Sequence, residues 1–181
     1  MKFIETDLPG VMVLEPQVWK DHRGHFFEAV HGQKFKGTKV PPNFVQDNFS
    51  RSLKGVLRGM HTQVNRPQGK LVRAITGEIF DVVVDVRRDS ATFGKWTGVI
   101  LSGENFKSLY VPPGFLHGFC VLSETADVEY KCTDFYDPSD EMGICWNDPD
   151  LKINWPINNP VLSVKDAQLP TLAKMNYRLP E

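Results

Sequence analysis

Short runs of β-branched and aromatic residues recur along the chain, and glycine, proline, asparagine and aspartate separate them. Such runs are typical of β-strands, and their close spacing is typical of an antiparallel sandwich or barrel. The expected strands lie within residues 10–16, 55–63, 69–77, 78–86, 95–103, 107–113, 118–123 and 127–136. Helical periodicity is weak, with short helices expected only around residues 31–36 and after Asp166. The pattern predicts an all-β fold with few short helices.

One run indicates how a strand covers the core. Two sets of side chains alternate over residues 80–87, a first set of Phe80, Val82, Val84 and Val86 and a second set of Asp81, Val83, Asp85 and Arg87. Successive side chains of a strand point to opposite faces. The first set is apolar and the second is mixed, which predicts a strand that covers a core on one side.

The length of the chain suits a single domain. Its 181 residues can bury a sizeable core, and no linker-like segment divides them, so we expect one domain over residues 1–181. The first 50 residues look like hairpins that could pack on the barrel or on a second subunit. The proline-rich stretch 155–170 predicts that the tail, residues 155–181, is extended and wraps around the body.

Charge and composition limit the partners of the chain. The formal net charge is −1 without long runs of one sign, which argues against nucleic acid and membrane surfaces. Apolar runs are too short to cross a bilayer, and the first residues lack the apolar core of a secretory signal. Cys120, Cys132 and Cys145 match neither a disulfide framework nor a CxxC metal site. We therefore expect reduced thiols, two of them packed on strands, and a cytoplasmic location.

His61, in the stretch LRGMHTQ at residues 57–63, could be a metal ligand, a catalytic base or a polar core residue. Gln63 stands where a second ligand would be, and the nearby stretch PPGFLH adds only His117. Zinc and iron sites usually use three or four protein ligands, so the sequence predicts no metal. Glycine-rich phosphate loops are absent too, and we expect arginine side chains to bind any phosphate.

Lys70 and Arg58 lie close to His61 in the sequence. The connection VNRPQG, residues 64–69, is short enough to make the flanking strands a hairpin, which would place Lys70 across from His61. Strict alternation puts Arg58 on the opposite face. Gly59 lies between Arg58 and His61, and a bulge at this glycine could turn both side chains to one site.

A tyrosine and a carboxylate could work with His61. Alternation puts Tyr130, Cys132, Asp134 and Tyr136 on one face of their strand. A tyrosine opposite a histidine can give a proton to the other side of a substrate. Asp166, next to Lys165 in the stretch LSVKD, could reach His61 and fix its tautomer. Alternatively, Tyr130 packs on its strand with its hydroxyl in water, and Lys165 and Asp166 are a solvated surface pair.

The sequence closely resembles the dTDP-4-dehydrorhamnose 3,5-epimerases of the cupin-like superfamily, almost from end to end. The resemblance rests on the stretches LPGV, EPQVWKDHRGHFFE, FVQDNFSRSLKGVLRGMH, PQGKLVRAITGEIFDVVVDVRRDSATFGKW, VPPGFLHGF, YKCTDFYDP, GICWNDPDLKINWP and LSVKD. It implies a jelly-roll barrel, a homodimer and a cofactor-free isomerase. The implied reaction inverts C3 and C5 of dTDP-4-dehydro-6-deoxy-D-glucose through enolates to give dTDP-4-dehydro-L-rhamnose.

The resemblance also implies roles for particular residues. His61 with Asp166 resembles the family's catalytic base, and Tyr130 resembles its acid. Lys70 resembles the group that stabilises the enolate. The implied substrate-binding residues are Arg23, Glu28, Gln46, Asn48, Arg58, Lys70, His117, Tyr136, Glu141 and Lys165, some of them reaching across the dimer. The negatively charged oxygen of an enolate needs a nearby cation, and the Lys70 side chain would supply one.

Several positions depart from the family's common pattern, namely Thr62, Phe49, Pro113, Leu116 and Val164. None of them is an implied catalytic group. They border the implied pocket, which leaves epimerisation at C3 or C5 alone as an alternative. A metal-dependent cupin enzyme and a sugar-nucleotide binding module without catalysis are further alternatives.

Overall fold

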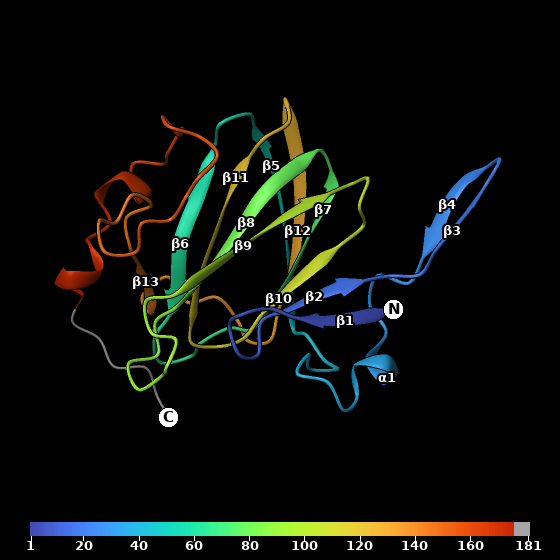
Figure 1. The fold of residues 1–181 in the computed structure, drawn as a ribbon, viewed down its shortest axis with the longest axis horizontal. Coiled ribbons are helices and arrows are strands. Elements are labelled where there is room, and N and C mark those ends of the chain that lie inside the picture. The colour runs from blue at the N-terminus through green and yellow to red at the C-terminus, as the bar shows by residue number, and fades with distance from the viewer. Residues whose placement is uncertain (176–181) are drawn as a thin grey trace.

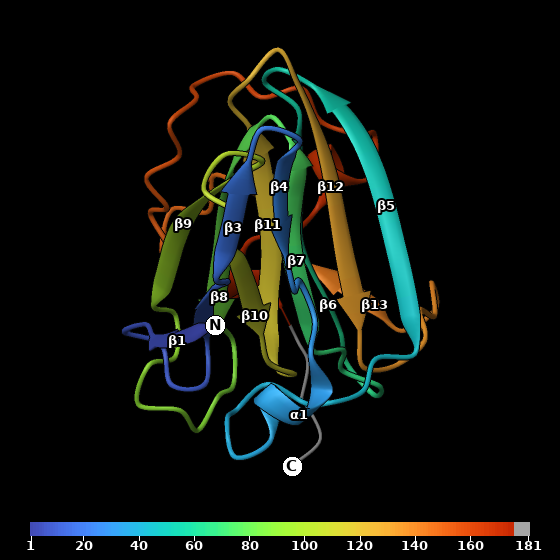
Figure 2. The same cartoon turned by 90° about the vertical axis from the view of Figure 1, so that its right-hand side faces the viewer.

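Two antiparallel β-sheets form the body of the computed structural model, which describes residues 1–175 (Figures 1 and 2). The six-stranded sheet has the order β1 (Lys2–Glu5), β2 (Met12–Glu15), β10 (Ser108–Val111), β7 (Lys70–Thr76), β12 (Thr125–Cys132) and β5 (Gln46–Leu53). The five-stranded sheet has the order β13 (Glu141–Gly143), β6 (Leu57–Gln63), β11 (Phe115–Val121), β8 (Glu78–Asp85) and β9 (Trp96–Ser102).

Helices are few and short, as the weak helical periodicity predicts. They are α1 (Gly32–Phe35) and two 3₁₀ turns, η1 (Asp166–Gln168) and η2 (Leu172–Lys174). Every run expected to be a strand overlaps one, so the all-β prediction is confirmed. Within residues 1–175, no helix has the length and apolar character that crossing a membrane requires.

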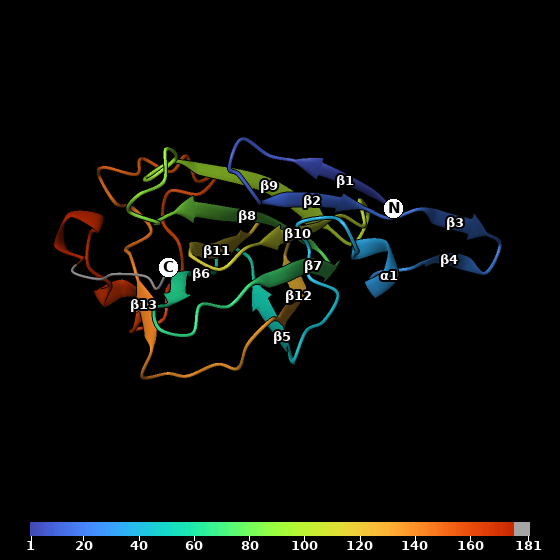
Figure 3. The ribbon, with the colours of Figure 1, turned by 90° about the horizontal axis from the view of Figure 1, so that it is seen from below.

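A third, two-stranded sheet consists of β3 (Val18–Asp21) and β4 (Gly24–Phe27). This hairpin extends away from the body (Figures 1 and 3), and β1 pairs with β2 as a second hairpin. The first 50 residues therefore contain the hairpins that the sequence predicts. Trp19 and Phe26 contact each other on the extended hairpin with tilted rings, yet they are 50% and 66% exposed, so the hairpin leaves a large aromatic surface uncovered in the single chain.

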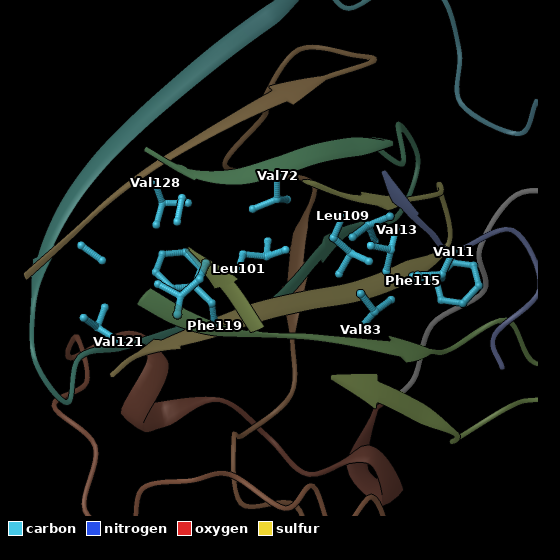
Figure 4. Packing of buried hydrophobic residues seen from close by; sticks show 14 of the residues in the cluster. Val11, Val13, Val72, Val83, Leu101, Leu109, Phe115, Phe119, Val121 and Val128 are labelled. Carbon is cyan, nitrogen blue, oxygen red and sulfur yellow. The ribbon is translucent and has the colours of Figure 1, made fainter. Parts of the chain in front are cut away.

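The main core lies between the two large sheets. Buried side chains from both sheets meet there, among them Val72, Val83, Leu109, Phe115 and Phe119 (Figure 4). Each fully buried side chain of this kind contributes about 1.5–3 kcal/mol by removing apolar surface from water. Alternating apolar residues on facing strands account for this core.

Strand β8 is buried on both faces, so the prediction of a one-sided strand is wrong. Val83 packs into the core between the sheets, whereas Val82 and Val84 pack in a second cluster on the outer face. The C-terminal segment covers that face with Trp155 and other apolar side chains. The sequence of the strand alone does not show that a distant segment covers its outer side.

The two carboxylates of β8 tolerate burial because each has partners. Arg87, Ser90 and Thr92 donate hydrogen bonds to the fully buried Asp85. Burial raises the pKa of Asp85, but these hydrogen bonds outweigh it and lower the pKa to about 2. Asp81 is equally buried and contacts a histidine of the site described below.

Strands β6 and β7 do not form a hairpin, which corrects the prediction for residues 64–69. The two strands belong to different sheets. The connection crosses between them, and the Asp140 carboxylate holds it by accepting hydrogen bonds from the backbone N–H groups of Asn65 and Arg66, both at 2.8 Å. The short connection made a hairpin plausible, but β6 and β7 each pair with other strands.

Strand β5 is an eight-residue edge strand that the sequence did not indicate. Its segment, QDNFSRSL, lacks apolar alternation. It pairs with β12 over its full length, from Gln46 opposite Cys132 to Leu53 opposite Thr125. The polar side chains that hid this strand line a cavity instead of packing in the core.

The segment after β13 wraps the outer face of the five-stranded sheet. Residues 155–165 contain no helix and only an isolated bridge, from Val161 to Val56. Apolar side chains of the segment pack on that sheet. Over residues 155–165 the tail is extended, whereas the 3₁₀ turns η1 and η2 interrupt it over residues 166–174. Residues 176–181 of the predicted tail lie outside the described residues.

Candidate active site

A cavity of about 510 Å³ opens between the two large sheets. Eight of the site residues expected from the sequence line it, namely Asn48, Arg58, His61, Lys70, His117, Tyr130, Lys165 and Asp166. They come from strands β5, β6, β7, β11 and β12 and from the C-terminal segment. The cavity therefore collects polar groups from segments far apart in the sequence, which is typical of ligand sites.

His61 and Asp166 form a closely bonded pair in this cavity. His61 Nε2 lies 2.7 Å from Asp166 Oδ1, and the Asp166 side chain is 6% exposed. Burial raises the pKa of Asp166, but the hydrogen bond and charge of His61 outweigh it and lower the pKa. The carboxylate is thus ionised and can accept a hydrogen bond from Nε2–H, which leaves Nδ1 as the ring nitrogen available for other contacts.

The Nδ1 atom of His61 faces a second carboxylate. Glu141 Oε1 lies 3.3 Å from Nδ1. Glu141 also accepts hydrogen bonds from the Tyr136 hydroxyl, at 2.6 Å, and from the Lys165 ammonium. Burial raises the pKa of Glu141, but these hydrogen bonds lower it more. One ionised carboxylate therefore joins His61 to Tyr136 and Lys165.

A bulge at Gly59 brings Arg58 and His61 to the same cavity, the possibility that the sequence left open against strict alternation. His61 pairs with His117 and Arg58 with Phe119, so β6 uses one residue more than β11 between these pairs. Gly59 has φ +116°, and a Cβ atom there would lie 2.6 Å from the Gly118 Cα. Only glycine fits this position. The Arg58 Nε group donates a hydrogen bond to Ser52 Oγ.

Lys70 and Tyr130 enter the cavity from the six-stranded sheet, opposite the sheet that carries His61. Burial lowers the pKa of Lys70, while the charges of Glu141 and Asp81 act in the other direction. Burial raises the pKa of Tyr130, which keeps its phenol protonated at neutral pH. Lys70 is thus near His61, but it faces it across the cavity and not along a hairpin.

His117 has a carboxylate partner that the sequence analysis missed. Its Nε2 atom lies 2.9 and 3.0 Å from the two carboxylate oxygens of Asp81, and both residues are buried. The available signal was an acidic residue inside the valine-rich run of β8. Such a residue is rarely fully buried without a partner.

Five expected substrate-binding residues do not line the cavity. Gln46 borders it, because its Nε2 group donates to Asn48 Oδ1 and its Oε1 accepts from the Tyr136 backbone N–H. Tyr136 and Glu141 join it through the contacts of His61 described above. Arg23 and Glu28 do not approach it: Arg23 pairs with Asp21 on the extended hairpin, and Glu28 pairs with Lys34.

The described residues offer no evident metal centre. In residues 1–175, no group of three or more histidine, cysteine, aspartate or glutamate side chains is arranged to hold a metal ion. Cys120, Cys132 and Cys145 are free thiols, and the first two lie on β11 and β12, as expected.

Comparison with known proteins gives a consistent result. A family model described as dTDP-4-dehydrorhamnose 3,5-epimerase matches residues 5–174. The dTDP-4-dehydrorhamnose 3,5-epimerase of Pseudomonas aeruginosa is 53% identical over 170 residues, which cover 93% of this chain and 94% of that protein. The protein of the same name from Neisseria gonorrhoeae is 51% identical over 175 residues, or 96% of this chain. These cover 53% of the Neisseria protein, so the chain spans about half its length.

A solved structure is similar over almost the whole chain. The dTDP-6-deoxy-D-glucose-3,5-epimerase of Legionella pneumophila was crystallised in complex with dTDP-4-keto-L-rhamnose. It superposes with a TM-score of 0.95 at 46% identity, covering 99% of this chain and 98% of the other. A likeness of this extent includes both sheets and the segments that line the cavity.

Proposed function

The chain belongs to the dTDP-4-dehydrorhamnose 3,5-epimerase family, and we propose that the cavity between its two sheets is its active site. The protein is a carbohydrate epimerase of dTDP-L-rhamnose biosynthesis. It inverts C3 and C5 of dTDP-4-dehydro-6-deoxy-D-glucose to give dTDP-4-dehydro-L-rhamnose. The observation that carries the proposal is that His61 and Tyr130 line one cavity from opposite sheets.

The reaction needs a base, a cation and an acid. The C4 ketone acidifies the hydrogens at C3 and C5, so a base can remove either one and leave an enolate. A cation near the enolate oxygen stabilises the charge that develops on it. Inversion then requires a proton to arrive from the face opposite to the base. The cavity contains one group suited to each step.

His61 is the proposed base. Asp166 holds its Nε2–H, which fixes the tautomer and stabilises the imidazolium that forms when Nδ1 takes the substrate proton. In the ligand-free protein Nδ1 faces Glu141, so the Glu141 carboxylate has to leave this position before a C–H group can approach. Tyr136 and Lys165, which both bond Glu141, are proposed nucleotide-binding residues and could draw it away.

Tyr130 is the proposed acid. It lies on β12, across the cavity from His61 on β6, as protonation from the second face requires. Burial raises its pKa, so the hydroxyl carries its proton until the enolate accepts it. A tyrosine that only packed in the core would not need to line the cavity.

Lys70 is the proposed electrophilic support for the enolate oxygen. Lys70 is half-buried and lines the cavity, which strengthens the attraction of its ammonium to a developing negative charge. His117 lines the same cavity with Asp81 behind it, and we assign it to the same oxygen as a hydrogen-bond donor. Asp81 is then a positioning residue for His117.

The remaining polar residues are proposed to bind the dTDP moiety. Arg58 is exposed towards the cavity and supplies a planar cation suited to phosphate oxygens. The side of the cavity near Glu141 carries four more proposed dTDP-binding residues, Gln46, Asn48, Lys165 and Tyr136. Tyr136 is 47% exposed and offers an aromatic face to a nucleobase.

A homodimer completes the proposed site. Arg23 and Glu28 do not reach the cavity of their own chain, and the hairpin that carries Arg23 leaves Trp19 and Phe26 uncovered. A second copy of the chain could accept this hairpin at its cavity and bury the aromatic pair, as a symmetric pair of contacts. The proposal explains both the exposed aromatics and the position of Arg23.

Mixing two inactive variants tests the homodimer. Arg23→Ala and His61→Ala should each be inactive alone, and refolding them together should restore about a quarter of wild-type activity. Half of the dimers are then mixed, and one of their two sites has both groups intact. No recovery, with mixed dimers demonstrated by differential tagging, would contradict the shared site.

The cytoplasm is the proposed location. A nucleotide-sugar substrate and three free thiols support it, and cell fractionation checks it. A fraction that followed the periplasm or the medium would contradict it.

Proton exchange in heavy water tests the function as a whole. Incubation of the purified protein with dTDP-4-dehydro-6-deoxy-D-glucose in deuterated water should introduce deuterium at both C3 and C5, because each inversion passes through an enolate. NMR of the sugar follows both positions. Exchange at one carbon would make the protein a mono-epimerase, and exchange at neither would exclude the mechanism.

A further inference from the structure

Ser50 has a buried hydroxyl group without a hydrogen-bond partner. It lies on β5 and lines the cavity. Within residues 1–175, its Oγ is the one buried side-chain oxygen or nitrogen that lacks a partner. Buried polar groups in proteins are almost always hydrogen-bonded, and an unpaired one needs an explanation.

The neighbours of Ser50 on the same face of β5 are all engaged. Asn48 accepts from Gln46 Nε2 and donates to Cys132 Sγ at 3.5 Å. Ser52 Oγ accepts from Arg58 Nε at 3.0 Å. Alternation places residues 48, 50 and 52 on one side of the strand, so Ser50 is the free position between two occupied ones.

The register of β5 places Ser50 one position along the inner face from the residue opposite Tyr130, the proposed acid. Asn48 is opposite Tyr130, and Ser50 is opposite Val128, the next position on that face of β12. Gln46, which bonds Tyr136 at the proposed nucleotide side, lies beyond Asn48 in the other direction. The order along the strand is therefore Gln46 at the proposed nucleotide side, Asn48 opposite the proposed acid, Ser50, and then Ser52 with Arg58.

We propose that the Ser50 hydroxyl is a substrate-binding group that hydrogen-bonds a hydroxyl of the sugar ring. The inference rests on the proposed function of the cavity. A serine hydroxyl can both donate and accept a hydrogen bond. A sugar hydroxyl can do the same, whereas an anionic oxygen can only accept, so the sugar hydroxyl is the better match. The unmet hydrogen bond in the free protein becomes a bond to substrate, so Ser50 gives up stability in exchange for recognition of the sugar.

Replacement of Ser50 by alanine tests the proposal with two readouts. In Ser50→Ala, KM for dTDP-4-dehydro-6-deoxy-D-glucose should rise about five- to tenfold, since one neutral hydrogen bond is lost. The Kd for dTDP alone should not change, because dTDP lacks the sugar. The thermal midpoint of the ligand-free variant should be no lower than that of the wild type, because no internal hydrogen bond is removed.

Ser102→Ala is the matched control. Ser102 is 6% exposed, its Oγ accepts a hydrogen bond from the Asn105 backbone N–H, and it does not line the cavity. Its removal should lower the thermal midpoint and leave KM unchanged.

Three results would overturn the assignment of Ser50. They are an unchanged KM, an equal loss of affinity for dTDP, and a fall in the midpoint like that of Ser102→Ala. Each leaves the deuterium exchange of the wild-type protein intact. A failure of this inference is thus distinct from a failure of the proposed function, in which the wild-type protein itself does not exchange.

Discussion

His61→Asn lowers the rate of deuterium exchange at C3 and C5 by about 10³-fold or more, as the expected result of removing the base. Positioned general bases contribute about 10²–10⁴-fold, and the second histidine–carboxylate pair of the cavity, His117 with Asp81, is assigned to the enolate oxygen and not to the proton. The asparagine side chain remains polar but cannot take the proton. NMR of the sugar in deuterated water measures both carbons at once.

The affinity for dTDP separates loss of the base from loss of the site. Because the proposed nucleotide contacts come from residues such as Arg58 and Tyr136, the Kd for dTDP should change less than threefold. An unchanged thermal midpoint shows that the fold is intact. Exchange that continued at a tenth of the wild-type rate or faster would mean that the base is another residue.

Tyr130→Phe should separate proton loss from inversion. The variant should form dTDP-4-dehydro-L-rhamnose about 10²-fold more slowly, because the enolate no longer receives its proton from the second face. His61 is intact and can still remove and return a proton on its own side, so exchange with deuterated water should fall much less. The ratio of inversion to exchange, measured by NMR in one sample, is the readout.

Tyr110→Phe is the control for this prediction. Tyr110 is also buried, but it packs in the cluster around Phe35 and does not line the cavity. Its inversion to exchange ratio should equal that of the wild type. An equal loss of exchange and inversion in Tyr130→Phe would assign the tyrosine to binding or to the base, and no longer to the acid.

The sequence predicted the strands more reliably than their partners. Runs of β-branched residues are a local property and identified the interior strands correctly. The polar strand β5 escaped because its inner side chains, such as Asn48 and Ser50, line a cavity. The hairpin expected at residues 64–69 failed because the choice between two sheets depends on contacts such as Asp140 with Asn65, which no local pattern contains.

The structure brings together in one cavity most of the residues that the sequence singled out for the site. The bulge at Gly59 was a possibility that the sequence left open, because strict alternation puts Arg58 and His61 on opposite faces, and the strand register shows it. The residues Asp81 and Glu141 show the limit. The first was not identified as a partner of His117, and the second was assigned to substrate without its contact to His61. Both contacts join segments far apart in the sequence, which only the fold brings together.

The position of Asp166 in the C-terminal segment has a consequence for how a newly made chain becomes active. Asp166 begins the 3₁₀ turn η1, in a C-terminal segment that packs on the outer face of the five-stranded sheet through apolar side chains such as Trp155. A chain whose sheets have paired while this segment is still undocked has a base without its carboxylate. We therefore expect the return of activity during refolding to follow the docking of this segment.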